Sequence, residues 1–130
     1  MERKPKLLMV EDDDLNLKVY SYILVKNFQL LLCENDTQFF DALDKDNYDL
    51  FVIDLSLGFG KDGISLVKEL RTMEKYKNTP VVVLTANVQK KDELISMEAG
   101  ATKFLRKPIE KNLLIKELLD CLKTPGNPEG

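Results

Sequence analysis

Four acidic residues stand in a row directly behind an apolar run near the start of the chain. The stretch LLMVEDDD places Glu11, Asp12, Asp13 and Asp14 where a buried strand would end. Two unit charges about 4 Å apart repel by roughly 4 kcal/mol at an effective dielectric constant near 20. Such a cluster therefore either spreads into water or holds a cation. For Asp13 and Asp14 we expect solvent exposure or a capping role at the following helix.

Three further polar residues end other apolar runs. Asp54 lies at the end of YDLFVID, Thr85 at the end of PVVVLT, and Lys107 follows TKFLR. If these runs are neighbouring strands, the carboxylates converge and favour a hard divalent cation such as Mg²⁺. A lysine and a hydroxyl opposite them suit the oxygens of a phosphoryl group. A carboxylate between the two, Asp54, can act as a nucleophile and form an aspartyl phosphate.

The apolar pattern alternates between short runs and helical periods, which predicts strands and helices in alternation. We expect strands over residues 6–10, 28–33, 48–55, 80–86 and 102–107. We expect helices over residues 14–26, from 36 onward, 63–74, 90–99 and 111–123. Asp36 is the expected N-cap of the second helix, and Gly100 the glycine that ends the fourth. The last helix is expected to turn its leucines inward: Leu113, Leu114, Leu118 and Leu122. Five strands alternating with five helices imply a parallel sheet covered on both faces, with sites at the carboxyl ends of its strands.

Length and composition are those of one globular domain. The chain has 130 residues, of which 44% are hydrophobic and 32% charged, and its net charge is −3, so no nucleic-acid surface is indicated. No apolar run approaches the roughly 20 residues of a membrane span, and the N-terminus lacks the pattern of a signal peptide. Cys33 and Cys121 fit no metal spacing, so we expect reduced thiols and a cytoplasmic protein.

Taken together, these pieces resemble the receiver domain of two-component response regulators. The matching pieces are MVEDD, FVID, DG at 62–63, LTA at 84–86 and RKP at 106–108, and the resemblance covers about residues 5–123. It implies a doubly wound, flavodoxin-like (βα)5 fold, α/β in class, with the strand order 2-1-3-4-5. We therefore expect residues 1–123 to form the receiver domain and residues 124–130 to be a tail or linker stub.

The resemblance also implies a role for each matching residue. Glu11 and Asp12 match the acidic pair that holds Mg²⁺ (or Mn²⁺), directly or through water. Ser56 would lend its backbone carbonyl to the metal. Asp54 matches the phosphoacceptor, and Lys107 matches the lysine that pairs with the phosphoryl group.

Two switch positions and two neighbours complete the implied set. Thr85 matches the hydroxyl that turns toward the phosphoryl group, and Ala86 the small residue that leaves it room. Phe104 lies where the family carries an aromatic residue that moves inward when Thr85 moves. The peptide bond before Pro108 is expected to be cis.

The function implied by this resemblance is that of a phosphorylation switch. A partner histidine kinase or histidine phosphotransfer protein would donate the phosphoryl group to Asp54, because the chain contains no histidine. The surface around the last two strands and the fourth helix would then change and control a downstream protein or a fused output domain. We expect a monomer or a phosphorylation-dependent dimer, no contact with nucleic acid or membrane, and no enzymatic activity beyond autocatalytic phosphorylation and dephosphorylation of Asp54.

Other functions are weighed against this one. The alternative is a receiver-shaped interaction module that acts without phosphorylation, and the complete set of site residues argues against it. Phosphatases with an aspartyl nucleophile carry a second acid two residues on, where this chain has Ser56. A flavin carrier of the same fold class would need a first loop that accepts a phosphate, which EDDD would repel.

Overall fold

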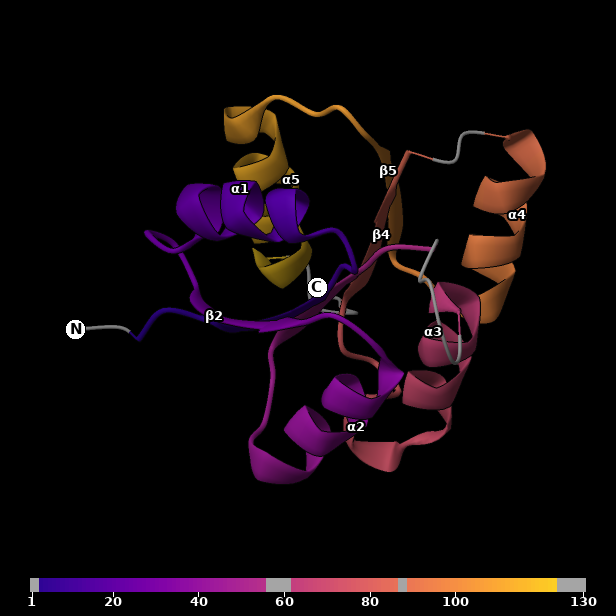
Figure 1. Cartoon of the computed structure of the whole chain (residues 1–130). Helices are drawn as coiled ribbons and strands as arrows, with labels where there is room; N and C mark the ends of the chain where they lie inside the picture. The colour runs from indigo at the N-terminus through magenta and orange to yellow at the C-terminus, as the bar shows by residue number, and fades with distance from the viewer. Residues whose placement is uncertain (1–2, 56–61, 87–88, 124–130) are drawn as a thin grey trace.

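Five parallel strands form one sheet at the centre of the molecule (Figure 1). The computed structural model describes residues 3–55, 62–86 and 89–123. The strands are β1 (Lys6–Val10), β2 (Gln29–Cys33), β3 (Leu50–Ile53), β4 (Val81–Thr85) and β5 (Lys103–Arg106). The helices are α1 (Asp14–Leu24), α2 (Asp36–Lys45), α3 (Gly63–Thr72), α4 (Lys90–Ala99) and α5 (Lys111–Lys123), with a 3-10 turn η1 (Glu74–Tyr76) after α3. The spatial order is β2-β1-β3-β4-β5, which confirms the predicted fold class and strand order.

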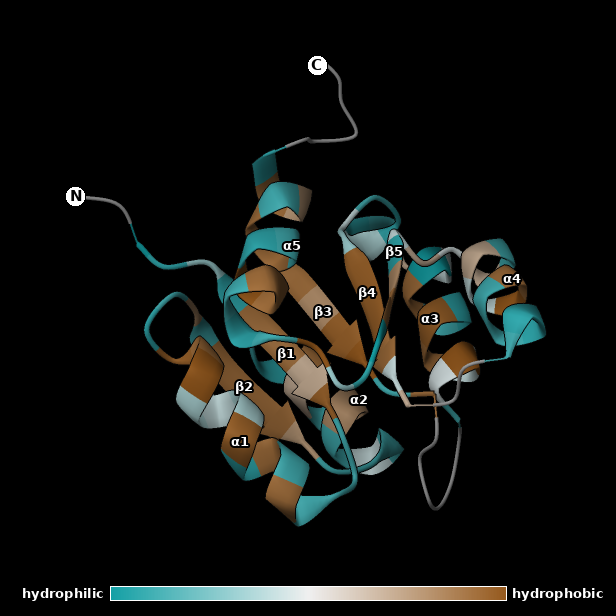
Figure 2. Ribbon diagram, turned by 90° about the horizontal axis from the view of Figure 1, so that it is seen from above, coloured by the Kyte–Doolittle hydropathy of each residue, from teal (hydrophilic) through white to brown (hydrophobic). Residues whose placement is uncertain are grey.

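The helices cover both faces of the sheet. Helices α1 and α5 pack on one face, and α2, α3 and α4 pack on the other (Figure 1). The three inner strands β1, β3 and β4 are therefore buried on both sides, which explains their continuous apolar sequences, visible as brown ribbons in Figure 2. Each face carries its own core cluster. Phe39, Phe51 and Leu70 belong to the cluster under α2 and α3, and Leu24 and Leu114 to the cluster under α1 and α5.

Two predicted details at the helices are wrong. The N-cap of α2 is Asn35 instead of Asp36, because Asn35 has the extended backbone of a cap and its side chain accepts a hydrogen bond from the N–H of Gln38. Leu113 is 46% exposed. The inward stripe of α5 runs through Leu114, Leu118 and Cys121, and Leu113 lies one helical step away from it.

Other predicted details are confirmed. Asp13 caps α1 and accepts a hydrogen bond from the N–H of Asn16, and Asp14 is exposed in the first turn of that helix. Gly100 ends α4 with φ +118°, a conformation that side chains rarely adopt. One predicted boundary differs: strand β3 starts two residues later than predicted and ends two residues earlier, which is the usual variation in assigning element ends.

Both cysteines are buried, and neither forms a disulfide in the described structure. Burial raises the pKa of the Cys33 thiol to about 12. Within the described ranges, no helix combines the length and the apolar character that crossing a membrane requires.

Candidate functional site

The sheet's hydrogen bonds continue one residue past the strands and so position the residues of the site. The N–H of Asp54 donates to the carbonyl of Val10 (3.1 Å), and the N–H of Lys107 donates to the carbonyl of Thr85 (3.0 Å). The N–H of Glu11 is bonded in the same way to the end of β2 (2.9 Å). Glu11, Asp54, Thr85 and Lys107 therefore lie at one edge, where the carboxyl ends of β1, β3, β4 and β5 meet.

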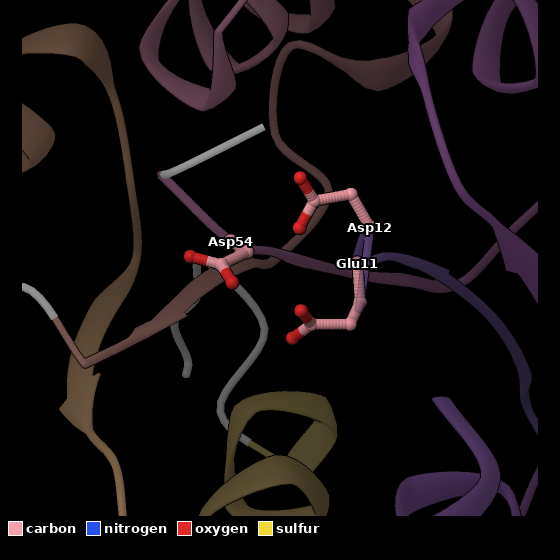
Figure 3. Close-up of side chains that lie close together, drawn as sticks. All are labelled: Glu11, Asp12 and Asp54. Atoms are coloured by element: carbon pink, nitrogen blue, oxygen red, sulfur yellow. The ribbon is translucent and has the colours of Figure 1, made fainter. Parts of the chain in front are cut away.

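Three carboxylates lie together at this edge (Figure 3). One oxygen each of Glu11, Asp12 and Asp54 can be chosen so that all three lie within 4.8 Å of one another. Glu11 and Asp12 lie on opposite sides of the end of β1, because successive residues of an extended chain point in opposite directions. Glu11 and Asp54 are buried, whereas Asp12 is exposed. The site thus has an oxygen-only donor set with one side open to solvent, which suits a hard divalent cation that keeps some of its waters.

The ammonium group of Lys107 is held between two of these carboxylates. Its Nζ donates to Oε1 of Glu11 (2.5 Å) and to Oδ2 of Asp54 (3.1 Å), and the lysine side chain is 10% exposed. Burial alone lowers the pKa of Lys107, but its hydrogen bond to Glu11 and the charge of Asp54 reverse this and raise the pKa above its ordinary value. Burial raises the pKa of Glu11, and the hydrogen bond from Lys107 offsets only part of that effect.

The remaining predicted residues take up positions around this centre. Thr85 is fully buried at the end of β4, and Ala86 follows it in an exposed position. Phe104 is half-buried in β5 and packs against the core cluster under α2 and α3. The peptide bond before Pro108 is cis, as expected. Ser56, the predicted carbonyl ligand, lies outside the described residues.

The DG pair at 62–63 has a structural reason at this site. Asp62 caps α3 and accepts a hydrogen bond from the N–H of Ser65 (2.9 Å). A Cβ atom on Gly63 would lie 2.2 Å from the backbone oxygen of Asp54 and 2.8 Å from Cα of Leu55. The glycine therefore allows α3 to begin directly against the backbone that carries the Asp54 carboxylate.

Two features of the site are not predicted from the sequence. One is the direct contact between Lys107 and Glu11, which depends on how two long side chains reach across the sheet. The other is Tyr20 of α1, whose ring centroid lies 5.6 Å from the Lys107 ammonium. An aromatic residue on the inward side of an amphipathic helix indicates core packing and gives no further signal.

Comparison with known proteins places this geometry in a family. The family model of the response regulator receiver domain matches residues 7–119. The Sensory/regulatory protein RpfC of Xanthomonas campestris pv. campestris is 34% identical over 121 residues, which cover 91% of this chain and 16% of RpfC. The regulatory protein VirG of Agrobacterium fabrum is 30% identical over 106 residues, which cover 79% of this chain and 40% of VirG. The chain therefore spans less than half the length of either relative.

Solved structures agree with the sequence comparisons. The receiver domain of the sensor histidine kinase PA1611 from Pseudomonas aeruginosa PAO1, crystallised with a magnesium ion coordinated in the active site cleft, matches with a TM-score of 0.84 and 26% identity. The match covers 93% of this chain and 99% of that one. The family model matches most of the chain, and both the strand order and the cluster of Glu11, Asp12 and Asp54 agree with it. The chain therefore belongs to the response regulator receiver domain family of two-component signalling.

Proposed function

We propose that this receiver domain is a phosphoacceptor switch in which Asp54 is the acceptor. The observation that carries the proposal is the position of the Asp54 carboxylate, 3.1 Å from the Lys107 ammonium and beside the oxygens of Glu11 and Asp12. A carboxylate between a cation site and an ammonium can act as a nucleophile. The charges on its two sides offset the negative charge of the group that it receives.

In the proposed step, a carboxylate oxygen of Asp54 attacks the phosphorus atom of a phosphohistidine on a histidine kinase or histidine phosphotransfer protein. A P–O bond to Asp54 forms while the P–N bond to the imidazole breaks. The imidazole nitrogen keeps the electron pair of that bond and takes a proton from solvent. Lys107 then donates a hydrogen bond to an oxygen of the transferred phosphoryl group. This new hydrogen bond replaces part of the present contact between Lys107 and Asp54.

Glu11, Asp12 and Asp54 are the residues that would hold Mg²⁺ (or Mn²⁺). When bound, the ion supplies positive charge against the phosphoryl oxygens. Because Glu11 already accepts a hydrogen bond from Lys107, we expect it to reach the ion through a water molecule. The backbone carbonyl of Ser56 is proposed as a further ligand from the family resemblance. The magnesium ion in the PA1611 receiver domain supports this assignment.

The output of the switch is proposed to involve the surface around β4, β5 and α4. Thr85 would turn toward the phosphoryl group, Ala86 would leave room for that group, and Phe104 would move with Thr85. Residues 1–123 would act as the receiver unit of a cytoplasmic protein, and residues 124–130 as a tail or linker. The unit would control a downstream protein or a fused output domain, as a monomer or as a phosphorylation-dependent dimer.

The proposal is tested by incubating the protein with acetyl phosphate and Mg²⁺ and recording its intact mass. We expect a gain of one phosphoryl group that a chelator abolishes. Asp54→Asn should gain nothing. Asp14→Asn is the matched control, because Asp14 belongs to the same acidic run but is exposed on α1, and it should gain the group as the parent does. If the folded parent gains no phosphoryl group under these conditions, the proposal is wrong, and an interaction module without phosphorylation becomes the better account.

A further inference from the structure

The Lys107 ammonium, which lies between two carboxylates, also lies over the ring of Tyr20. Its centroid is 5.6 Å from Nζ, within the distance at which an ammonium is attracted to an aromatic face. Among the described residues, the same Nζ also donates hydrogen bonds to Glu11 and Asp54. The ammonium is thus bounded by two carboxylates from β1 and β3 and by one ring from α1.

The position of Tyr20 is fixed by packing. The residue is 7% exposed and belongs to the core cluster under α1 and α5, together with Leu24, Met9 and Leu114. Within the described ranges, its hydroxyl has no hydrogen-bond partner, so the ring is what Tyr20 presents to the site. Because a buried aromatic side chain has only two rotatable bonds, the ring is a rigid surface for the ammonium.

Of the contacts that Lys107 makes with described residues, the one with the Tyr20 ring is the contact that we expect phosphorylation to change least. Phosphorylation turns the Asp54 carboxylate into an acyl phosphate, whose remaining carbonyl oxygen is uncharged, so the present hydrogen bond between Asp54 and Nζ is lost or weakened. Glu11 is one of the three acids that would hold the metal, so its oxygens are shared with that role. The ring takes no part in either change. It can therefore hold the ammonium near the same place before and after the transfer.

We propose that Tyr20 is a positioning residue for Lys107, whose ring face holds the ammonium in reach of the group carried by Asp54. The inference rests on the proposed function of Asp54 and adds to it a residue from a different element. The plain alternative is that Tyr20 only fills the core under α1. In the first case the ring positions the ammonium of Lys107, and in the second it does not. Two substitutions at Tyr20 distinguish these two roles.

Tyr20→Phe keeps the ring and removes only the hydroxyl. Tyr20→Leu keeps an apolar side chain and removes the ring. A matched control is Tyr48→Leu, because Tyr48 is also 7% exposed but belongs to the core cluster on the other face of the sheet. Tyr48→Leu also removes the hydrogen bond that the Tyr48 hydroxyl donates to the carbonyl of Ala42 (2.9 Å). This control therefore gives an upper limit for what the loss of a buried tyrosine ring does to the protein in general.

The first measurement uses the metal-free full chain without phosphodonor. The ammonium signal of Lys107 is followed by ¹H–¹⁵N NMR, assigned by its loss in Lys107→Met. A hydrogen-bonded, buried ammonium exchanges its protons slowly enough to be seen. We expect the signal in the parent, in Tyr20→Phe and in Tyr48→Leu, and we expect it to be shifted and broadened in Tyr20→Leu.

The second measurement is the rate of Asp54 phosphorylation by acetyl phosphate with Mg²⁺. We expect Tyr20→Leu to be slower than the parent by about tenfold, and Tyr20→Phe to stay within about twofold of it. If Tyr20→Leu keeps both the parent's ammonium signal and its rate, or if Tyr20→Phe and Tyr48→Leu lose as much as Tyr20→Leu, the inference is wrong while the proposed function stands. If the parent itself is not phosphorylated, the proposed function fails, and the inference fails with it.

Discussion

Replacement of Lys107 by methionine tests the electrostatics of the site because it removes the only cation that contacts Glu11 and Asp54 among the described residues. The ammonium lies 2.5 Å from a Glu11 oxygen and 3.1 Å from an Asp54 oxygen, and none of the three side chains is more than 10% exposed. Removing one partner of a buried ion pair typically costs about 3–5 kcal/mol. Because the neighbouring Asp12 is exposed and water can reach that side, we expect Lys107→Met to lose about 3 kcal/mol, at the lower end of this range.

The free energy of unfolding is measured with urea in metal-free buffer. The matched control is Lys103→Met, which removes a lysine with an equally short contact, 2.5 Å to Glu117. That pair is 30% and 27% exposed, so we expect the control to lose less than about 1 kcal/mol. Mg²⁺ should then stabilise Lys107→Met more than the parent, because the ion replaces the missing positive charge. At a concentration tenfold above its dissociation constant, an ion adds about 1.4 kcal/mol.

The loss should depend on pH in a defined window. The pKa of Lys107 is raised above its ordinary value of 10.5 in the folded state. The stabilising charge of Lys107 is therefore fully present below pH 10.5 and is lost as the pH rises through the raised pKa. On the acid side the contribution of the ion pair disappears as the Glu11 carboxylate takes up a proton. Because burial raises the pKa of Glu11 above its ordinary value of 4.5, the effect of Lys107→Met on the free energy of unfolding should begin to decrease at a pH above 4.5. A loss below about 1 kcal/mol in metal-free buffer, or a loss that is unchanged between about pH 7 and pH 4, would refute this reasoning.

Three further perturbations test other parts of the account. Gly63→Ala should lower the unfolding free energy by about 2 kcal/mol, because the new Cβ would lie 2.2 Å from the Asp54 backbone oxygen; a urea midpoint equal to the parent's would contradict this. Arg71→Met should cost about 3 kcal/mol in the same assay, because the Arg71 guanidinium donates to three backbone carbonyls at 2.6–2.9 Å, which link α3 to η1, to the segment before β4 and to the C-cap of α4. A loss under about 1 kcal/mol would show that water replaces these bonds without cost. The Cys33 thiol, whose pKa burial raises to about 12, should react with a chromogenic disulfide reagent at about pH 8 only as fast as the protein unfolds, and an immediate reaction of Cys33 in the native protein would show that it is accessible.

The sequence predicts the sheet well because its signals are local. A strand buried on both faces has to be apolar throughout, and VVVL in β4 is a run of this kind. Polar residues that end such strands must meet at one edge, so Asp54 and Thr85 could be brought together from the sequence alone. The order of the strands is different: periodicity does not contain it, and it followed from the family resemblance.

Contacts that depend on side-chain reach could not be predicted. Whether Lys107 bonds to Glu11 as well as to Asp54 depends on the rotamers of two long side chains. Leu113 fits the apolar pattern of its helix as well as Leu114 does, and only the direction in which α5 faces the sheet separates the two. Asn35 and Asp36 are both good capping residues, so the choice between them depends on where the backbone turns helical.

The most direct test of the central claim is to locate the phosphoryl group on the chain. An aspartyl phosphate is an acyl phosphate, so borohydride reduces it to homoserine, which peptide mass spectrometry can assign to a position. After incubation with acetyl phosphate and Mg²⁺, the account predicts homoserine at position 54 alone. It also predicts none in samples to which chelator was added before the phosphodonor. Homoserine at Asp12 with Asp54 intact, or an acid-labile phosphoryl group that persists in Asp54→Asn, would contradict the account.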